Sequence, residues 1–138
     1  MATAGYSGTP LAKKLGLKPD MRLVLLHAPE GYASTLGPLP DGLDLRTRLA
    51  RSVDLVQLFV TEAASLAREF APASRALRPA GALWVSWPKG KGKAKIPTDL
   101  DEGIVRTIGL DAGLVDVKVC AVDEVWSGLK FVRRVRDR

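Results

Sequence analysis

Apolar residues occur in blocks along the chain, and the spacing within each block predicts the element that it forms. Two runs, 22–27 and 53–60, are apolar almost without interruption, which is typical of strands buried on both faces of a parallel sheet. A third apolar run, 82–87, follows Pro79 and Gly81, which we expect to form a turn that ends the preceding helix. Between residues 43 and 49, leucine and threonine alternate with charged residues, and this period of two predicts a half-buried edge strand.

Helical spacing and capping residues predict four helices, the first before the run 22–27 and the other three after it. The first follows Thr9 and Pro10 and ends at Gly16, and the second is short, between residues 29 and 36. The third follows Thr61, which we expect to cap it, and Pro72 within its pattern predicts a kink or two shorter helices. The fourth follows a cap-like threonine and two acids, and its expected buried face carries Leu100, Ile104 and Ile108.

Two further strands, 115–121 and 129–135, end the pattern and are close enough in sequence to form an antiparallel pair. The alternation of strands and helices predicts a three-layer α/β fold with a mainly parallel, Rossmann-like sheet. We interpret residues 1–138 as a single small domain, with a flexible lead-in over 1–9 and a mobile lysine and glycine loop over 89–97.

Composition narrows the classes of function. The chain of 138 residues has a net charge of +6, a single cysteine, Cys120, and a single histidine, His27. An internal disulfide is therefore impossible, and we expect no metal site, because the ligands that close such sites do not occur at paired spacings. No apolar run reaches the ~18 residues of a membrane-spanning helix and the first residues do not resemble a signal peptide, so we expect a cytoplasmic protein without membrane contact.

The segment L-R-P-A-G-A-L-W-V (77–85) resembles the junction before the fifth strand of class I S-adenosylmethionine-dependent methyltransferases. From Asp54 onward the chain looks like the second half of that fold, with D-L-V-Q-L-F-V as the fourth strand and the last two strands as its antiparallel end. The resemblance implies a methyltransferase-like fold. The first strand, however, runs into H-A-P-E-G-Y (27–32) rather than a G-x-G-x-G turn, and no acid clearly ends the second strand, so we expect no cofactor and lean away from an enzyme.

The whole chain is also similar to a small family of uncharacterised bacterial proteins. The shared segments are the opening G-Y-S-G-T-P-L, the strand L-W-V-S-W-P-K, the helix start T-D-L-D-E and the ending D-V-K-V-C-A-V-D-E-V-W-S-G-L-K-F-V-R-R. This resemblance implies no particular activity.

A candidate site follows from the parallel sheet, because ligands bind beyond the carboxyl ends of such strands. We expect a pocket there that is lined by His27, Glu30, Tyr32 and Trp87, with Lys89 at its mouth. Histidine suits proton transfer near neutral pH, although a histidine that only bonds the neighbouring backbone is the simpler interpretation. Trp84 and Trp87 should lie on opposite faces of their strand, with Trp84 in the core and Trp87 free to stack on a base.

Four lysines alternate with small residues directly after this strand. Lys89, Lys91, Lys93 and Lys95 lie in a stretch without an acid, where their ammonium groups can converge on phosphates, or where they simply form a solvated loop. Our main prediction is a non-catalytic protein that binds nucleic acid, a nucleotide or another polyanion through this loop. The alternatives are an enzyme on a small nucleotide-like substrate, with His27 or Glu30 as proton carrier, and a homodimer that pairs through its exposed terminal strand.

Overall fold

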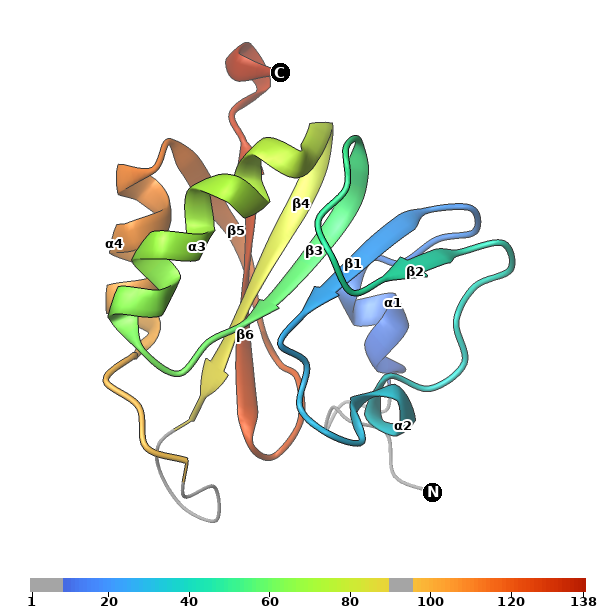
Figure 1. The fold of residues 1–138 in the computed structure, drawn as a ribbon, viewed down its shortest axis with the longest axis horizontal. Helices are drawn as coiled ribbons and strands as arrows, with labels where there is room; N and C mark the ends of the chain where they lie inside the picture. The colour runs from blue at the N-terminus through green and yellow to red at the C-terminus, as the bar shows by residue number, and fades with distance from the viewer. Residues whose placement is uncertain (1–8, 90–95) are drawn as a thin grey trace.

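Six strands form one mixed sheet in residues 9–89 and 96–138, which are the residues that the computed structural model describes (Figure 1). Their order across the sheet is β2-β1-β3-β4-β6-β5. The strands are β1 (Arg22–Leu26), β2 (Asp44–Arg46), β3 (Val53–Phe59), β4 (Leu77–Pro88), β5 (Leu114–Ala121) and β6 (Trp126–Arg133). The first four strands in the order are parallel, and β6 is antiparallel to both β4 and β5, as the sequence predicts.

Helices pack on both faces of this sheet, so the predicted three-layer arrangement is confirmed. They are α1 (Leu11–Leu15), α2 (Tyr32–Leu36), α3 (Ala63–Ala76) and α4 (Glu102–Asp111), with a 3-10 turn, η1, at Val135–Asp137. The larger core lies between the sheet and the pair α3 and α4, and includes an edge-to-face contact between Phe70 and Phe131. The smaller core lies under α1 and α2, where buried Trp84 donates its indole N–H to the carbonyl oxygen of Leu15 at 3.0 Å.

The predicted turn at Pro79 and Gly81 is wrong, because these residues lie in the first part of β4. β4 begins at Leu77, and its pairing with β3 passes from Val53–Leu77 directly to Leu55–Ala82, so that residues 78–81 form an irregular bulge within the strand. A side chain at Gly81 would lie 2.9 Å from the carbonyl oxygen of Val53. Glycine is therefore needed there for the close approach of two strands rather than for a turn.

The helices also depart from the predictions in several details. α3 is one helix that includes Pro72, rather than two shorter ones (Figure 1). The predicted threonine caps are wrong, because the N-cap residues are Pro10, Glu62 and Asp101. In α4, Ile104 is 38% exposed, and Val105 and Gly109 are the buried positions beside the sheet.

Strand ends differ from the apolar runs by a few residues. β1 stops at Leu26, β2 keeps only three residues, and the last strand begins at Trp126 and lies inside the sheet between β4 and β5. The last strand of the chain is therefore not an exposed edge, since β2 and β5 are the edge strands of the described sheet, and a homodimer stays a prediction. The predicted lead-in and lysine loop fall largely on residues 1–8 and 90–95, outside the described residues. Within residues 9–89 and 96–138, none of the helices is both long and apolar enough to cross a membrane.

Candidate functional site

A pocket lies at the carboxyl ends of β1 and β3, on the edge of the sheet where the sequence places the candidate site. Its volume is about 310 Å³. The loop after β1 contributes His27, the end of β3 contributes an aromatic ring and a hydroxyl, and the first two turns of α3 contribute two polar side chains. The lining residues are His27, Phe59, Val60, Thr61, Ser65, Glu69 and Trp126.

A histidine and a glutamate meet at this pocket. The His27 Nε2 atom lies 2.6 Å from the Glu69 Oε1 atom, and the side chains are 59% and 28% exposed. His27 has a φ of +60°, a left-handed conformation in which the chain leaves β1 sharply. Residues other than glycine rarely adopt this conformation, and those that do are often found at functional sites.

This pair has the geometry of a base and the group that orients it. When the imidazole is neutral and donates its Nε2–H to Glu69, its Nδ1 atom is an acceptor for a proton. A carboxylate in this position also stabilises the imidazolium that forms after proton transfer. The arrangement therefore suits general acid–base chemistry on a ligand in the pocket.

Aromatic rings form the inner wall. The rings of Phe59 and Trp126 meet edge to face with centroids 5.2 Å apart, and the ring of Tyr32 meets that of Phe59 edge to face at 4.8 Å. Trp126 is only 7% exposed, so its ring is held by the core while it lines the pocket. Rigid aromatic walls of this kind suit a flat, partly apolar ligand.

The segment before α4 holds the outer side of the pocket in place. The Thr98 hydroxyl donates to the carbonyl oxygen of Thr61 at 2.6 Å, and Asp99 Oδ1 accepts the N–H of Ala63 at 2.8 Å. The first N–H of α3 thus gains a partner from a segment 36 residues later. Thr61 and the start of α3 are fixed as a result.

Tyr32 is in the core rather than in the pocket. It is 3% exposed, and its hydroxyl donates to Gln57 Oε1 at 2.6 Å, while Gln57 Nε2 donates to Ser86 Oγ at 3.1 Å. Burial raises the pKa of Tyr32 well above its ordinary value, although the bond to Gln57 opposes this. The hydroxyl is therefore a structural donor that attaches α2 to the sheet.

The other predicted site residues are not part of the pocket. Trp87 is 4% exposed and belongs to the core beneath α3 and α4, which leaves it no open ring face for stacking. Glu30 is exposed on the loop after β1 and does not line the pocket. Lys89 follows β4 at the same sheet edge, and Lys91, Lys93 and Lys95 lie outside the described residues.

The loop between β1 and α2 does not fit S-adenosylmethionine. Pro29 has no N–H, Gly31 is the single glycine of the loop, and the N–H of Tyr32 donates to the carbonyl oxygen of Pro29 at 3.1 Å. The loop therefore lacks the run of side-chain-free backbone by which a G-x-G-x-G turn lets a cofactor approach. β2 ends at Arg46, so there is no carboxylate at its end to bind a ribose. In the part of the chain that is described, no group of three or more His, Cys, Asp or Glu side chains is placed to hold a metal.

Solved structures with this fold include several methyltransferases. The chain is similar to an S-adenosylmethionine-dependent methyltransferase from Aquifex aeolicus, with 16% identity and a TM-score of 0.60 over 88% of this chain and 86% of that one. It is similar to a possible exported protein from Bordetella parapertussis, with 15% identity and a TM-score of 0.63 over 91% of this chain and 66% of that one. The fibrillarin pre-rRNA processing protein of Methanococcus jannaschii matches with 12% identity and a TM-score of 0.58 over 89% of this chain and 73% of that one.

These similarities show a methyltransferase-like Rossmann fold, as the sequence predicts. No protein-family model matches the chain, and no curated protein matches its sequence. The similarity to a family of uncharacterised bacterial proteins therefore stays a prediction.

Proposed function

We propose that the protein is an enzyme that binds a small nucleoside-like molecule in the His27–Glu69 pocket and uses His27 as its proton carrier. The observation that carries this proposal is the 2.6 Å contact between His27 Nε2 and Glu69 Oε1 at the wall of a pocket of about 310 Å³. Phe59 and Trp126 offer apolar surface for a base, and Thr61 and Ser65 offer hydroxyls for polar atoms of the ligand.

The occurrence of this fold in S-adenosylmethionine-dependent methyltransferases supports a nucleoside-like ligand at this edge and favours an enzyme over our main sequence prediction. The altered loop after β1 argues against the methyl donor itself. Polyanion binding by the loop that carries Lys89, Lys91, Lys93 and Lys95 stays a prediction.

Calorimetric titration with adenosine, AMP, S-adenosylhomocysteine and S-adenosylmethionine tests the binding step. Ser65→Phe should abolish binding, because the added ring fills the pocket from α3. Ala64→Phe is the matched control, since the same ring is added to an exposed position on the same helix. The proposal is wrong if the wild-type protein binds none of these compounds, or if both variants bind them equally well.

The proton-transfer step is tested by following each bound compound by liquid chromatography. For any compound that the wild-type protein converts, His27→Gln should lower the rate by about 10²- to 10⁴-fold while the dissociation constant changes little. Glu69→Gln should lower the rate less, because it leaves the imidazole in place but removes the charge that orients it. An unchanged rate in His27→Gln would exclude His27 as the proton carrier.

A further inference from the structure

Four lysines gather on the α1 face of the sheet, away from the pocket. We call Lys14, Lys18, Lys118 and Lys130 the lysine patch. Lys118 of β5 and Lys130 of β6 are direct cross-strand partners, and Lys118 Nζ donates to the carbonyl oxygen of Lys14 at 3.2 Å. The turn that ends α1 lies against Lys130, since a side chain added at Gly16 would be 3.8 Å from its Nζ atom.

No acid neutralises this patch. None of the ion pairs within residues 9–89 and 96–138 includes any of the four lysines, because arginine or His27 provides the cation in each of them. Residues 1–8 and 90–95 contain neither aspartate nor glutamate, so their side chains add no partner. The patch therefore carries an uncompensated positive charge.

The uncompensated charge of the lysine patch lowers the stability of the folded protein. Like charges directly opposite each other on neighbouring strands repel. Lys130 is also half-buried, and its pKa is lowered by burial first and then by the charges of Lys118 and Lys18. An anion bound to the patch would offset both effects.

We propose that the lysine patch binds the phosphodiester backbone of a nucleic acid. Its charges come from the end of a helix and from two strands, which spreads them over a surface instead of around one atom. Lysine is a common phosphate ligand, whereas it is depleted in interfaces between proteins. The net charge of +6 adds long-range attraction for a polyanion. This surface is separate from the pocket, so the proposal does not depend on the proposed enzyme activity.

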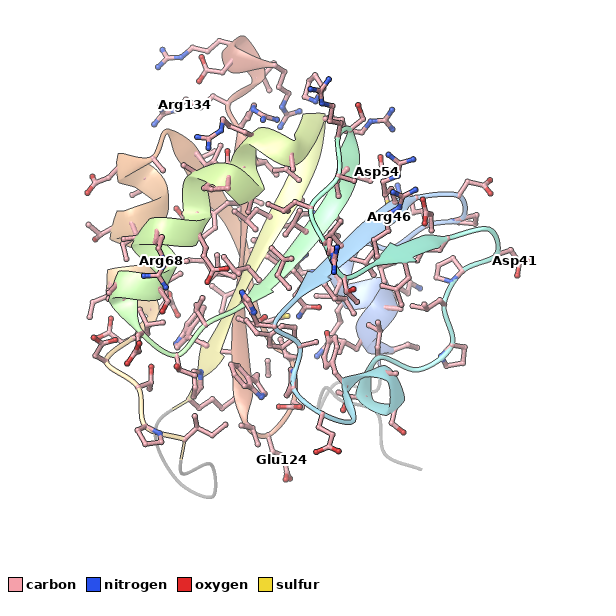
Figure 2. All side chains as sticks on the ribbon, viewed as in Figure 1. Asp41, Arg46, Asp54, Arg68, Glu124 and Arg134 are labelled. Atoms are coloured by element: carbon pink, nitrogen blue, oxygen red, sulfur yellow. The ribbon has the colours of Figure 1, made fainter. Side chains whose placement is uncertain are left out.

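The test compares two double variants that lose the same charge. Lys118→Gln/Lys130→Gln removes half of the patch, and Arg68→Gln/Arg75→Gln removes two exposed charges from α3, which covers the other face of the sheet (Figure 1). Arg68 is labelled in Figure 2. Fluorescence anisotropy measures the binding of labelled single-stranded RNA and DNA of about 20 nucleotides. With four phosphate contacts and single-stranded probes, wild-type affinity should fall about 50-fold between about 50 and 200 mM salt.

The patch variant should bind more weakly, and its salt slope should be smaller by about 1.4, whereas the control should stay within a few-fold of wild type. The patch variant should remain folded, because the repulsion that it loses offsets the one exposed hydrogen bond from Lys118 to the carbonyl oxygen of Lys14. Its circular dichroism spectrum checks this. Equal weakening in both double variants would overturn the proposal. Loss of binding only when Lys91, Lys93 and Lys95 are changed, or wild-type binding to polyglutamate but to neither nucleic acid, would also overturn it.

Discussion

Two consecutive hydrogen bonds join a hydroxyl, an amide and a second hydroxyl inside the smaller core. Tyr32 donates to Gln57 at 2.6 Å, and Gln57 donates to Ser86 at 3.1 Å, with all three side chains buried. Buried polar atoms are stable only when they are paired, and the described residues leave no buried side-chain nitrogen or oxygen without a partner. The contact fixes α2 close to Phe59, and through that ring it supports the pocket wall.

Removal of the Tyr32 hydroxyl should therefore destabilise the protein. In Tyr32→Phe, Gln57 Oε1 remains buried without its donor, and we expect the free energy of unfolding to fall by about 1–3 kcal/mol, measured by urea denaturation. A second change, Gln57→Leu, should recover part of this loss, because the unpaired amide is removed as well. Wild-type stability in the single variant would show that the hydrogen bond contributes nothing.

The helix α4 and the strand β6 pack with almost no space between them. A side chain added at Gly109 would overlap the ring of Phe131, which is fully buried in the larger core. Gly109 thus permits the close approach of helix and sheet, although its φ is ordinary and its conformation requires no glycine.

Two alanine substitutions in α4 should have opposite effects. Gly109→Ala should destabilise the protein by about 1–3 kcal/mol, because the ring of Phe131 must move in a packed core. Gly103→Ala on the exposed side of the same helix should be neutral or stabilise by up to about 1 kcal/mol, because alanine favours the helix. Thermal unfolding of both variants measures the difference, and equal shifts would contradict the packing argument.

The strands of the central sheet are predictable because their apolar runs are longer than those found in exposed segments. The bulge at 78–81 is not predictable, because Pro79 and Gly81 have the same local signature in a turn and in an irregular strand.

Of the site residues, His27 is predictable because it directly follows β1. Glu69 was missed because it lies 42 residues further along, and its one local signal is that it follows Ser65 by a single helical turn on the same side of α3. Trp87 was misjudged because burial depends on neighbours from other elements.

Positive charge is distributed unevenly over the protein. The lysine patch occupies the α1 face, and Arg134, Arg136 and Arg138 lie at the end of the chain beyond β6, where Figure 2 labels Arg134. Repulsion of this kind acts over distances comparable with the Debye length, so dissolved salt weakens it.

Added salt should stabilise the protein as a whole. We expect the unfolding midpoint to rise when sodium chloride is increased from about 20 to 200 mM, because the Debye length falls from about 20 Å to about 7 Å and the longer-range repulsion among these charges is screened. The rise should be smaller in Lys118→Gln/Lys130→Gln, which has less repulsion to screen. A midpoint that falls with salt in the wild-type protein would show that its ion pairs outweigh the repulsion.

The position of β6 has a consequence for how the protein is made. β6 lies between β4 and β5, its first residue Trp126 lines the pocket, and Lys130 belongs to the patch. A nascent chain that has not yet emerged from the ribosome beyond residue 125 therefore has an open edge on β4 and lacks a part of both surfaces. Neither surface can be complete until translation has passed these residues, and until then the unpaired edge is a natural target for chaperones.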